Sequence, residues 1–279
     1  MTDNNTAFDR DTMPFVAPCR QLAPFAALGW LRKGIRDWQQ APRESLAYGI
    51  FMAATIALVS LLAWAYGSVW LMVAMLGGFV FLAPLACIGL YAISAQLERG
   101  QPPSMAGSLR AAFRRHLGNE MLFAVILLVI FIVWVRSGAM VSIFFPSEGE
   151  PNLGNMATYL GIGTFVGAIF TAVTFSASAF SLPMIMHRDV DTITAVVTSI
   201  NAVLRNKFAM LVWLAVIVLA LVIGFATAFV SLVVILPVIG YAAWHGYLET
   251  IDASAFPRHA VGITAMPRNQ DGEGVNLGS

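Results

Sequence analysis

The stretch that decides the fold is residues 181–208, SLPMIMHRDVDTITAVVTSINAVLRNKF. A hydrophobic run that contains Pro183 ends here, and HRDVD at 187–191 opens a two-faced segment that continues to Asn206 and Lys207. A further hydrophobic run begins at Phe208. This order predicts a polar elbow with an amphipathic helix between two membrane crossings.

The composition indicates that lipid surrounds most of the chain. Of its 279 residues, 58% are hydrophobic and 11% are charged, and the mean hydropathy is +0.76. These values are outside the usual range of water-soluble domains. A formal net charge of +1 gives a nucleic-acid partner no electrostatic support. We therefore expect an all-α, polytopic membrane protein whose main partner is the lipid bilayer, with no nucleic acid bound.

Six hydrophobic runs are predicted to cross the bilayer, whose core takes about 20 residues of helix. The prolines at 84, 183 and 237 fall in the second, fourth and sixth runs, which predicts three hairpins; chance placement is the alternative. The runs cover residues 47–66, 69–95, 120–135 and 159–186, and two halves of the charge-free stretch 208–247, divided near Gly224.

Each hairpin has an amphipathic entry helix, predicted over residues 28–38, 104–117 and 189–207. In the first, Leu28 and Ile35 share one face, while Arg32 and Arg36 fall on the other side. Such a helix lies in the membrane interface or packs beneath the spans. Both alternatives place it on the cytoplasmic side.

The charges give the orientation. All of the 16 Lys and Arg residues except Arg136 fall on one side of a six-span topology, which the positive-inside rule makes cytoplasmic. We expect both termini in the cytoplasm, residues 1–27 and 253–279 to be disordered tails, and residues 28–252 to form the membrane domain.

The fourth run carries small and hydroxyl-bearing residues at helical spacing. Gly163 and Gly167 are followed by Thr171, Thr174 and Ser178. Such residues allow close approach and hydrogen bonding between membrane helices, so we expect this face to pack against neighbouring spans. A hydroxyl-lined solute path is the alternative.

Two histidines have neighbours that could support chemistry. His187 with Asp189 and Asp191 could hold a metal, but the aspartates stand where a helix N-terminus needs caps. His245 fits an interfacial aromatic belt, or it could relay a proton with Glu249. We predict capping, no metal or other cofactor, and no enzymatic activity, because the sequence lacks a recognisable catalytic motif.

Four motifs carry a resemblance. WLRKGIRDW at 30–38, FLAPL at 81–85, the elbow from Pro183 to Asp191 and the segment 199–206 resemble a family of predicted bacterial integral membrane proteins catalogued as a domain of unknown function. The resemblance extends over roughly residues 25–252. It implies six spans in a bacterial inner membrane, and assigns no reaction, ligand or site.

Two function classes follow from these patterns. The first is a non-catalytic assembly or scaffold component that presents its amphipathic elbows at the cytoplasmic interface, with other membrane proteins as candidate partners. The second is a small-solute transporter that uses the Thr/Ser-rich fourth span. The sequence shows no ionisable residue inside a predicted span, which counts against ion-coupled transport. We expect the first class.

Overall fold

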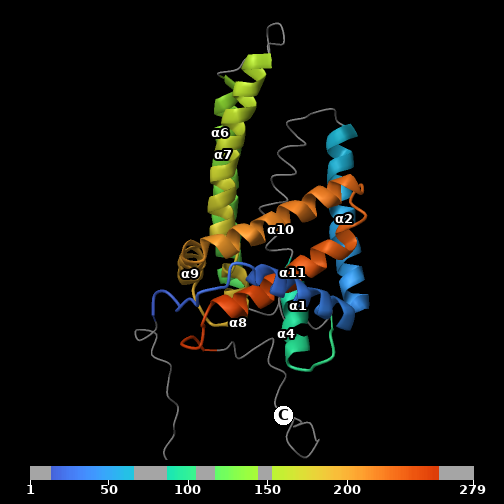
Figure 1. The fold of residues 1–279 in the computed structure, drawn as a ribbon, viewed down its shortest axis with the longest axis vertical. Helices are drawn as coiled ribbons and strands as arrows, with labels where there is room; N and C mark the ends of the chain where they lie inside the picture. The colour runs from blue at the N-terminus through green and yellow to red at the C-terminus, as the bar shows by residue number, and fades with distance from the viewer. Residues whose placement is uncertain (1–13, 66–86, 105–116, 144–152, 258–279) are drawn as a thin grey trace, which may run out of the picture.

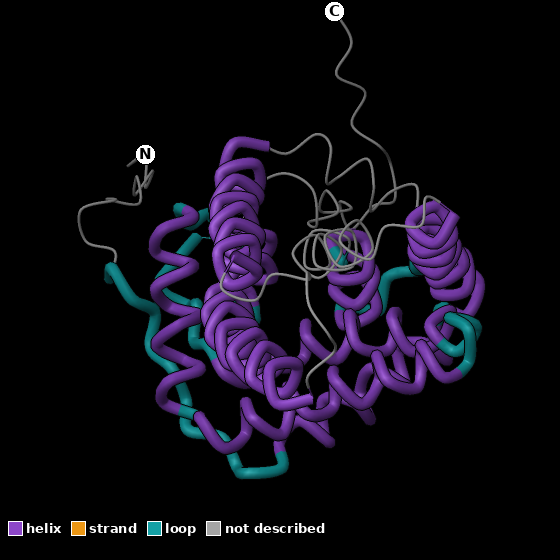
Figure 2. Tube along the Cα trace, turned by 90° about the horizontal axis from the view of Figure 1, so that it is seen from above, coloured by secondary structure: helices purple, strands orange, loops and turns teal. Residues whose placement is uncertain are grey.

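The structure is a computed structural model that describes residues 14–65, 87–104, 117–143 and 153–257. This part of the chain is almost wholly helical (Figure 2), with one isolated antiparallel bridge between Cys19 and Ile251. The all-α prediction is confirmed. The helices are α1 (Ala26–Gln40), α2 (Pro42–Ala65), α4 (Ile88–Glu98), α6 (Leu117–Ile143), α7 (Leu153–Ser178), α8 (Ser181–His187), α9 (Thr192–Arg205), α10 (Lys207–Ala226) and α11 (Leu232–Thr250).

Five described helical stretches are long and apolar enough to cross a membrane. Large apolar side chains project from them, with Phe51 70% and Phe165 68% exposed, which is costly in water and favourable in lipid. The second predicted run, 69–95, lies mostly outside the described residues, as does most of the entry helix 104–117. The five stretches are Pro42–Leu62, Gly118–Met140, Ala157–His187, Lys207–Ala226 and Leu232–Thr250.

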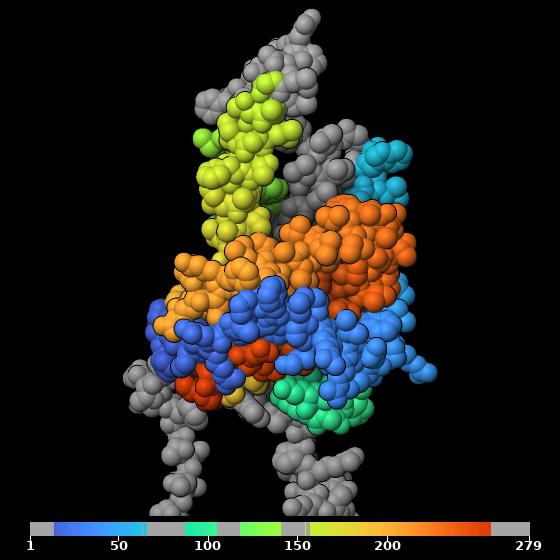
Figure 3. Space-filling view, viewed as in Figure 1, coloured from blue at the N-terminus to red at the C-terminus, as the bar shows by residue number. Residues whose placement is uncertain are grey.

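The helices run in two directions (Figure 1). α2, α6 and α7 lie along the long axis of the molecule, with α6 and α7 side by side, whereas α1, α10 and α11 cross that axis obliquely. Among the described elements, α1 and α11 form the most extensive helix pair. In Figure 3, the N-terminal segment and α1 (blue) lie across the molecule next to α10 (orange).

The buried face of α1 differs from the predicted apolar stripe. Trp30, Gly34 and Asp37 are buried, whereas Leu28 and Ile35 are about half exposed. The apolar stripe is divided between two environments, because Leu31 and Trp38 are partly buried against the core while Leu28 and Ile35 face outward. The packed alternative agrees with the buried face, and the outward Leu28 and Ile35 agree with an interfacial position.

Close helix approach occurs at glycines of α1, α2 and α11. A Cβ added at Gly34 would lie 2.5 Å from the carbonyl oxygen of Val238, and one at Gly49 would overlap the carbonyl group of Val233. At Gly163 and Gly167 an added Cβ would meet no atom within 4 Å. The close packing expected at this pair is therefore not found in the described structure.

Two helices, α2 and α6, extend beyond the predicted runs. α2 begins at Pro42, because proline suits the first turn of a helix. α6 continues beyond Arg136 to Ile143, since one exposed charge does not end a helix. The split of 208–247 is confirmed, with α10 ending at Ala226 and α11 beginning at Leu232.

The fourth run is one candidate span but two helices, α7 and α8. Pro183 is buried in the first turn of α8, where its missing N–H costs no helical hydrogen bond. The break is held by α9, because the Phe180 N–H donates to Ser199 Oγ at 3.1 Å and that hydroxyl donates to the Ser176 carbonyl at 2.7 Å.

The predicted disordered tails are wrong at their inner ends. Residues 14–27 and 253–257 are part of the packed structure, with Ala17, Ala27, Ala253 and Phe256 buried. Prolines there made the segments look irregular, but backbone hydrogen bonds to distant segments order them. The outer parts of both tails lie outside the described residues.

The glycine contacts give a stability prediction. Gly49→Ala should lower the free energy of unfolding in detergent by about 1–3 kcal/mol or more, because the added methyl group meets backbone atoms that cannot move aside. Gly167→Ala is the matched control, and should leave stability unchanged or raise it by up to about 1 kcal/mol. Equal unfolding midpoints for the two variants would contradict the α2–α11 packing.

Candidate functional site

Three segments that are far apart in sequence are hydrogen-bonded to one another, and we call residues 17–22, 187–192 and 250–257 together the clasp. The Arg20 N–H donates to the Thr250 carbonyl at 2.8 Å, and the Asp252 N–H donates to the Pro18 carbonyl at 2.9 Å. The Asp189 N–H donates to the Pro257 carbonyl at 2.9 Å. The clasp thus joins the N-terminal segment, the elbow and the end of the described chain.

Asn206 reinforces the clasp from the end of α9. Its Oδ1 accepts from the Leu22 N–H at 2.8 Å, and its Nδ2 donates to the Arg20 carbonyl at 3.1 Å. One amide side chain therefore supplies both an acceptor and a donor to the N-terminal segment.

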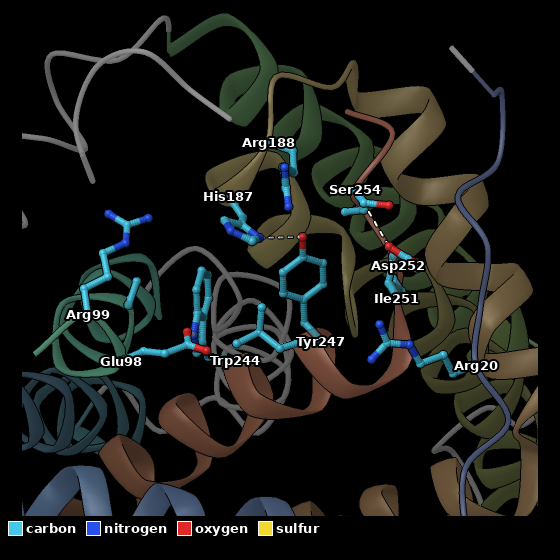
Figure 4. Close-up of a pocket in the computed structure, with 13 residues that line it drawn as sticks. Arg20, Glu98, Arg99, His187, Arg188, Trp244, Tyr247, Ile251, Asp252 and Ser254 are labelled. Atoms are coloured by element: carbon cyan, nitrogen blue, oxygen red, sulfur yellow. Dashed lines mark hydrogen bonds between the residues drawn. The ribbon is translucent and has the colours of Figure 1, made fainter. Parts of the chain in front are cut away.

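A polar cavity of about 370 Å³ lies beside the clasp (Figure 4). It is built from the N-terminal segment, the end of α4, the elbow, the last turns of α11 and the segment after it. Its lining residues are Arg20, Ala95, Glu98, Arg99, His187, Arg188, Trp244, Tyr247, Leu248, Ile251, Asp252, Ala253 and Ser254.

His187, singled out from the sequence, is held by two aromatic residues of α11. Its Nδ1 lies 3.0 Å from the Tyr247 hydroxyl. Its ring packs edge-on against Trp244 and Tyr247, with centroid distances of 5.5 and 5.7 Å. The imidazole is thus positioned at the cavity wall by one hydrogen bond and two ring contacts.

Three guanidinium groups and two carboxylates line the cavity. Glu98 Oε2 accepts from the Trp244 indole N–H at 3.4 Å. Asp252 accepts from the Ser254 N–H at 3.1 Å; the pKa of this carboxyl is held below its usual range by hydrogen bonds from Ser254 and, to a smaller extent, by Arg20 and Arg188. Both carboxylates therefore have defined roles in the wall.

One guanidinium nitrogen of Arg188 is hydrogen-bonded within the described part of the protein and another is not. Its Nη1 donates to the Phe256 carbonyl at 2.9 Å, while its buried Nε has no hydrogen-bond partner among the described residues. Within the same residues, neither Arg188 nor Arg20 makes an ion pair within 4 Å. Of the cavity residues, sequence analysis had selected only His187, because Arg20, Arg99 and Tyr247 come from segments that no local pattern connects.

The elbow aspartates have different roles. Asp191 caps α9, since its Oδ2 accepts from the Thr194 N–H at 2.8 Å. Asp189 is exposed and joins the clasp through its backbone instead. The capping hypothesis is confirmed for Asp191 and wrong for Asp189. Within the described residues, no group of three or more His, Cys, Asp or Glu side chains could hold a metal ion.

His245 is paired with Asp37 and not with Glu249. Its Nε2 lies 2.8 Å from Asp37 Oδ2, which also accepts from Ser94 Oγ. Glu249 pairs with Lys33 at 3.3 Å, on the exposed side of the same two helices. The proposed His245–Glu249 relay is therefore wrong. A signal for Asp37 existed in the sequence, because it follows Trp30 and Gly34 at helical spacing.

A second, apolar cavity of about 480 Å³ lies among α7, α10 and α11. Gly167, Thr171, Thr174 and Ser178 line it together with apolar residues that include Trp213. The Thr174 hydroxyl is buried and has no hydrogen-bond partner among the described residues. Gly163 is exposed and does not line this cavity. The predicted hydroxyl stripe thus borders a cavity over part of its length.

The two polar contacts between α1 and α11 should differ in strength. His245→Ala should lower the free energy of unfolding by about 1–3 kcal/mol, because it removes one of the two described hydrogen-bond partners of the buried Asp37 carboxylate and leaves Ser94. Lys33→Ala breaks an exposed pair and should cost between about 0 and 1 kcal/mol. Chemical unfolding in detergent tests this, and a loss for His245→Ala no larger than that for Lys33→Ala would contradict the buried pair.

The elbow gives a second comparison. Asp191→Ala should destabilise the protein by about 1 kcal/mol, the usual cost of a lost N-cap, whereas Asp191→Asn should be tolerated because asparagine also caps. Asp189→Ala should change stability by no more than about 0.5 kcal/mol. Thermal unfolding of the three variants decides the matter; a larger loss for Asp189→Ala than for Asp191→Ala would reverse the assignment.

Comparison with known proteins gives one match. Residues 71–187 match a family described as "Predicted integral membrane protein (DUF2189)", and this stretch contains FLAPL at 81–85 and reaches the elbow at His187. No curated protein and no solved structure matches the chain. The family resemblance inferred from the motifs is confirmed over these residues. Residues 71–187 are therefore similar to DUF2189, a family of predicted integral membrane proteins of unknown function.

Proposed function

We propose that this chain is a six-span protein of the bacterial inner membrane, organised as three hairpins with both termini in the cytoplasm. We further propose that it acts without catalysis, as an assembly or scaffold component. The observation that carries the proposal is the clasp, because it constrains how many times the chain crosses the membrane.

Two segments lie on the same side of a membrane only when an even number of crossings separates them. Segments 17–22 and 187–192 belong to one hydrogen-bonded cluster, so they lie on the same side of the membrane. Three described candidate spans separate them, Pro42–Leu62, Gly118–Met140 and Ala157–His187. Three crossings would place the segments on opposite sides. A further crossing between them would restore the same side, and this supports the proposal that the apolar run 69–95 crosses the membrane.

The same parity holds for the second half of the chain. Lys207–Ala226 and Leu232–Thr250 separate the elbow from segment 250–257, and two crossings return the chain to the side of the elbow. All three parts of the clasp then lie on the side that carries 15 of the 16 Lys and Arg residues, which is the cytoplasm by the positive-inside rule.

The bonding of the polar side chains supports a non-catalytic role. His187 is held by Tyr247, His245 by Asp37, and Asp191 by the start of α9. The two histidines each join one helix to another, and Asp191 caps its own helix. The clasp thereby offers a rigid cytoplasmic surface on which a partner membrane protein can assemble.

Topology reporters test the orientation. A reporter that is active only in the periplasm should be active when fused after Gly149 and silent when fused after Asp191 or Ser254. The expectation follows from clasp parity together with the charge distribution. Activity after Asp191 would reject the six-span topology.

Co-purification tests the scaffold role. Proteins recovered with the gently solubilised wild type should be reduced with Asn206→Ala, which removes two clasp hydrogen bonds, and retained with Thr164→Ala on the exposed face of α7. Identical partners for all three proteins would argue against a role for the clasp in assembly.

A small-solute transporter is the second candidate, favoured by the apolar cavity and the unpartnered hydroxyl of Thr174. Such a site suits a largely apolar solute with one hydrogen-bonding group. His245 lies inside a candidate span and pairs with Asp37, so the sequence-based objection that spans lack ionisable residues no longer holds. Solute uptake into proteoliposomes that falls with Thr174→Val, but not with Thr164→Val, would favour transport.

A further inference from the structure

We propose that the polar cavity beside the clasp binds a phosphate group, and that the source of this group is the headgroup of an anionic phospholipid. A free phosphorylated small molecule offers the same chemistry and is the other source to be tested. The binding itself does not depend on the scaffold role, and only the leaflet that supplies the lipid rests on the proposed topology.

Three guanidinium groups from distant segments converge on the polar cavity. Arg20 comes from the N-terminal segment, Arg99 from the end of α4 and Arg188 from the elbow, and all three line the same cavity. Figure 4 shows Arg188 directed toward the Tyr247 hydroxyl between the labelled residues of the wall. Arginine is the side chain best suited to phosphate, because its planar fork can donate two parallel hydrogen bonds to phosphate oxygens.

The cavity wall carries more arginines than carboxylates. Glu98 and Asp252 oppose the three arginines, so the wall has a net positive charge even with His187 neutral. Both carboxylates already accept hydrogen bonds from the protein, Glu98 from Trp244 and Asp252 from Ser254. An anion that enters therefore meets guanidinium donors that outnumber the competing carboxylates.

The Nε–H of Arg188 is a buried donor that lacks an acceptor among the described residues. The Nη1 of the same side chain is bonded to the Phe256 carbonyl. A buried donor on a charged group is costly when it is left unsatisfied. A phosphate oxygen is an acceptor that can satisfy it, and His187 and Tyr247 provide further hydrogen-bonding groups on the same wall.

The position of the cavity favours a lipid. Trp244 and Tyr247 lie near the end of the candidate span Leu232–Thr250, the position at which aromatic residues meet the headgroup layer. Leu248 and Ile251 add apolar surface to the lining. A volume of about 370 Å³ falls within the roughly 300–1,000 Å³ range of ligand pockets. A phospholipid can thus place its phosphate here while its chains stay in the bilayer.

Phosphate binding can be measured on the delipidated, full-length protein in detergent. Inorganic phosphate, exchanged for chloride at constant ionic strength, should raise the unfolding temperature in a saturable manner. Arg20→Gln and Arg188→Lys should each weaken the apparent affinity about tenfold, the loss expected for one charge-assisted hydrogen bond. Arg136→Gln is the matched control, because it removes an exposed arginine of α6 outside the cavity, and it should bind as the wild type does.

Arg20→Gln keeps the test decisive if Arg188→Lys disturbs folding. The side chain of Arg20 makes no hydrogen bond or ion pair with the described residues, and only its backbone takes part in the clasp. A change in phosphate affinity in this variant therefore reports on the cavity and not on a lost structural bond.

Reconstitution distinguishes the two sources. Protein from nanodiscs of equal parts phosphatidylglycerol and phosphatidylcholine should retain phosphatidylglycerol in native mass spectra, about tenfold less in Arg20→Gln, and unchanged in Arg136→Gln. Saturable phosphate binding without retained phosphatidylglycerol would overturn the lipid source and support a free phosphorylated molecule. Absence of binding in both experiments, or equal binding by wild type and Arg20→Gln, would overturn the site. None of these outcomes depends on the reporter fusions, so the site and the proposed topology can fail separately.

Discussion

The packing of Trp30 of α1 against α10, α11 and the α7–α8 break is the contact on which the rest of the structure depends. Trp30 is completely buried, and its ring packs edge-on against Phe180 at the α7–α8 break and against Trp213 of α10, with centroid distances of 6.3 and 5.6 Å. Another neighbour is Gly246, where an added Cβ would lie 2.9 Å from the indole ring. One side chain thus fixes α1, α10, α11 and the break in the fourth span relative to one another. Tryptophan has the area to make all of these contacts at once.

The clasp and the α1–α11 pair constrain the same part of the molecule in different ways. The pair is held by close backbone approach and by the buried Asp37–His245 contact, both insensitive to exposed charges. The clasp is held by hydrogen bonds between irregular segments. Irregular backbone of this kind is stable only outside the hydrocarbon layer or where protein buries it. The polar cavity occupies the junction of the two, at the end of α11, where charged side chains can remain hydrated while aromatic rings anchor the helix.

Sequence patterns predicted the features that depend on the spacing of nearby residues and on whether lipid or water surrounds a segment. Run length and hydropathy identified the five candidate spans of the described residues, and the position of Asp191 before a two-faced segment identified its capping role, because both follow from neighbours in the chain. The partners of Trp30, Asp37 and His187 could not be predicted in this way. Asp37 and His245 are separated by 208 residues, and no periodicity relates them. The Gly163–Gly167 pattern misled for the same reason, since a small-residue motif shows where a helix can approach and not whether one does. The close contacts found at Gly34 and Gly49 involve glycines without a second glycine four residues away. Their role becomes visible only from the path of α11.

The contacts along α11 pair it with α1 and α2 in antiparallel order. Trp30 meets Gly246, Gly34 meets Ala242 and Gly49 meets Val233, so residue numbers fall on α11 as they rise from α1 to α2. Ser45 joins this series through a hydroxyl contact of 2.8 Å with Tyr241. A single helix therefore sets the register of α1 and α2 together, across the interruption at Ala41. Because α11 follows all the other described helices in the sequence, the buried face of α1 lacks its α11 partners until the chain has been made as far as Gly246. Its earlier partners are Ser94 for Asp37, and Phe180 and Trp213 for Trp30. Until then, an amphipathic helix of this kind is stable at the membrane interface, with its apolar residues in the headgroup boundary. The two alternatives for residues 28–38, an interfacial helix and a packed helix, are therefore compatible as successive states of one segment, with the half-exposed Leu28 and Ile35 left on the outer face once Trp30 has been covered.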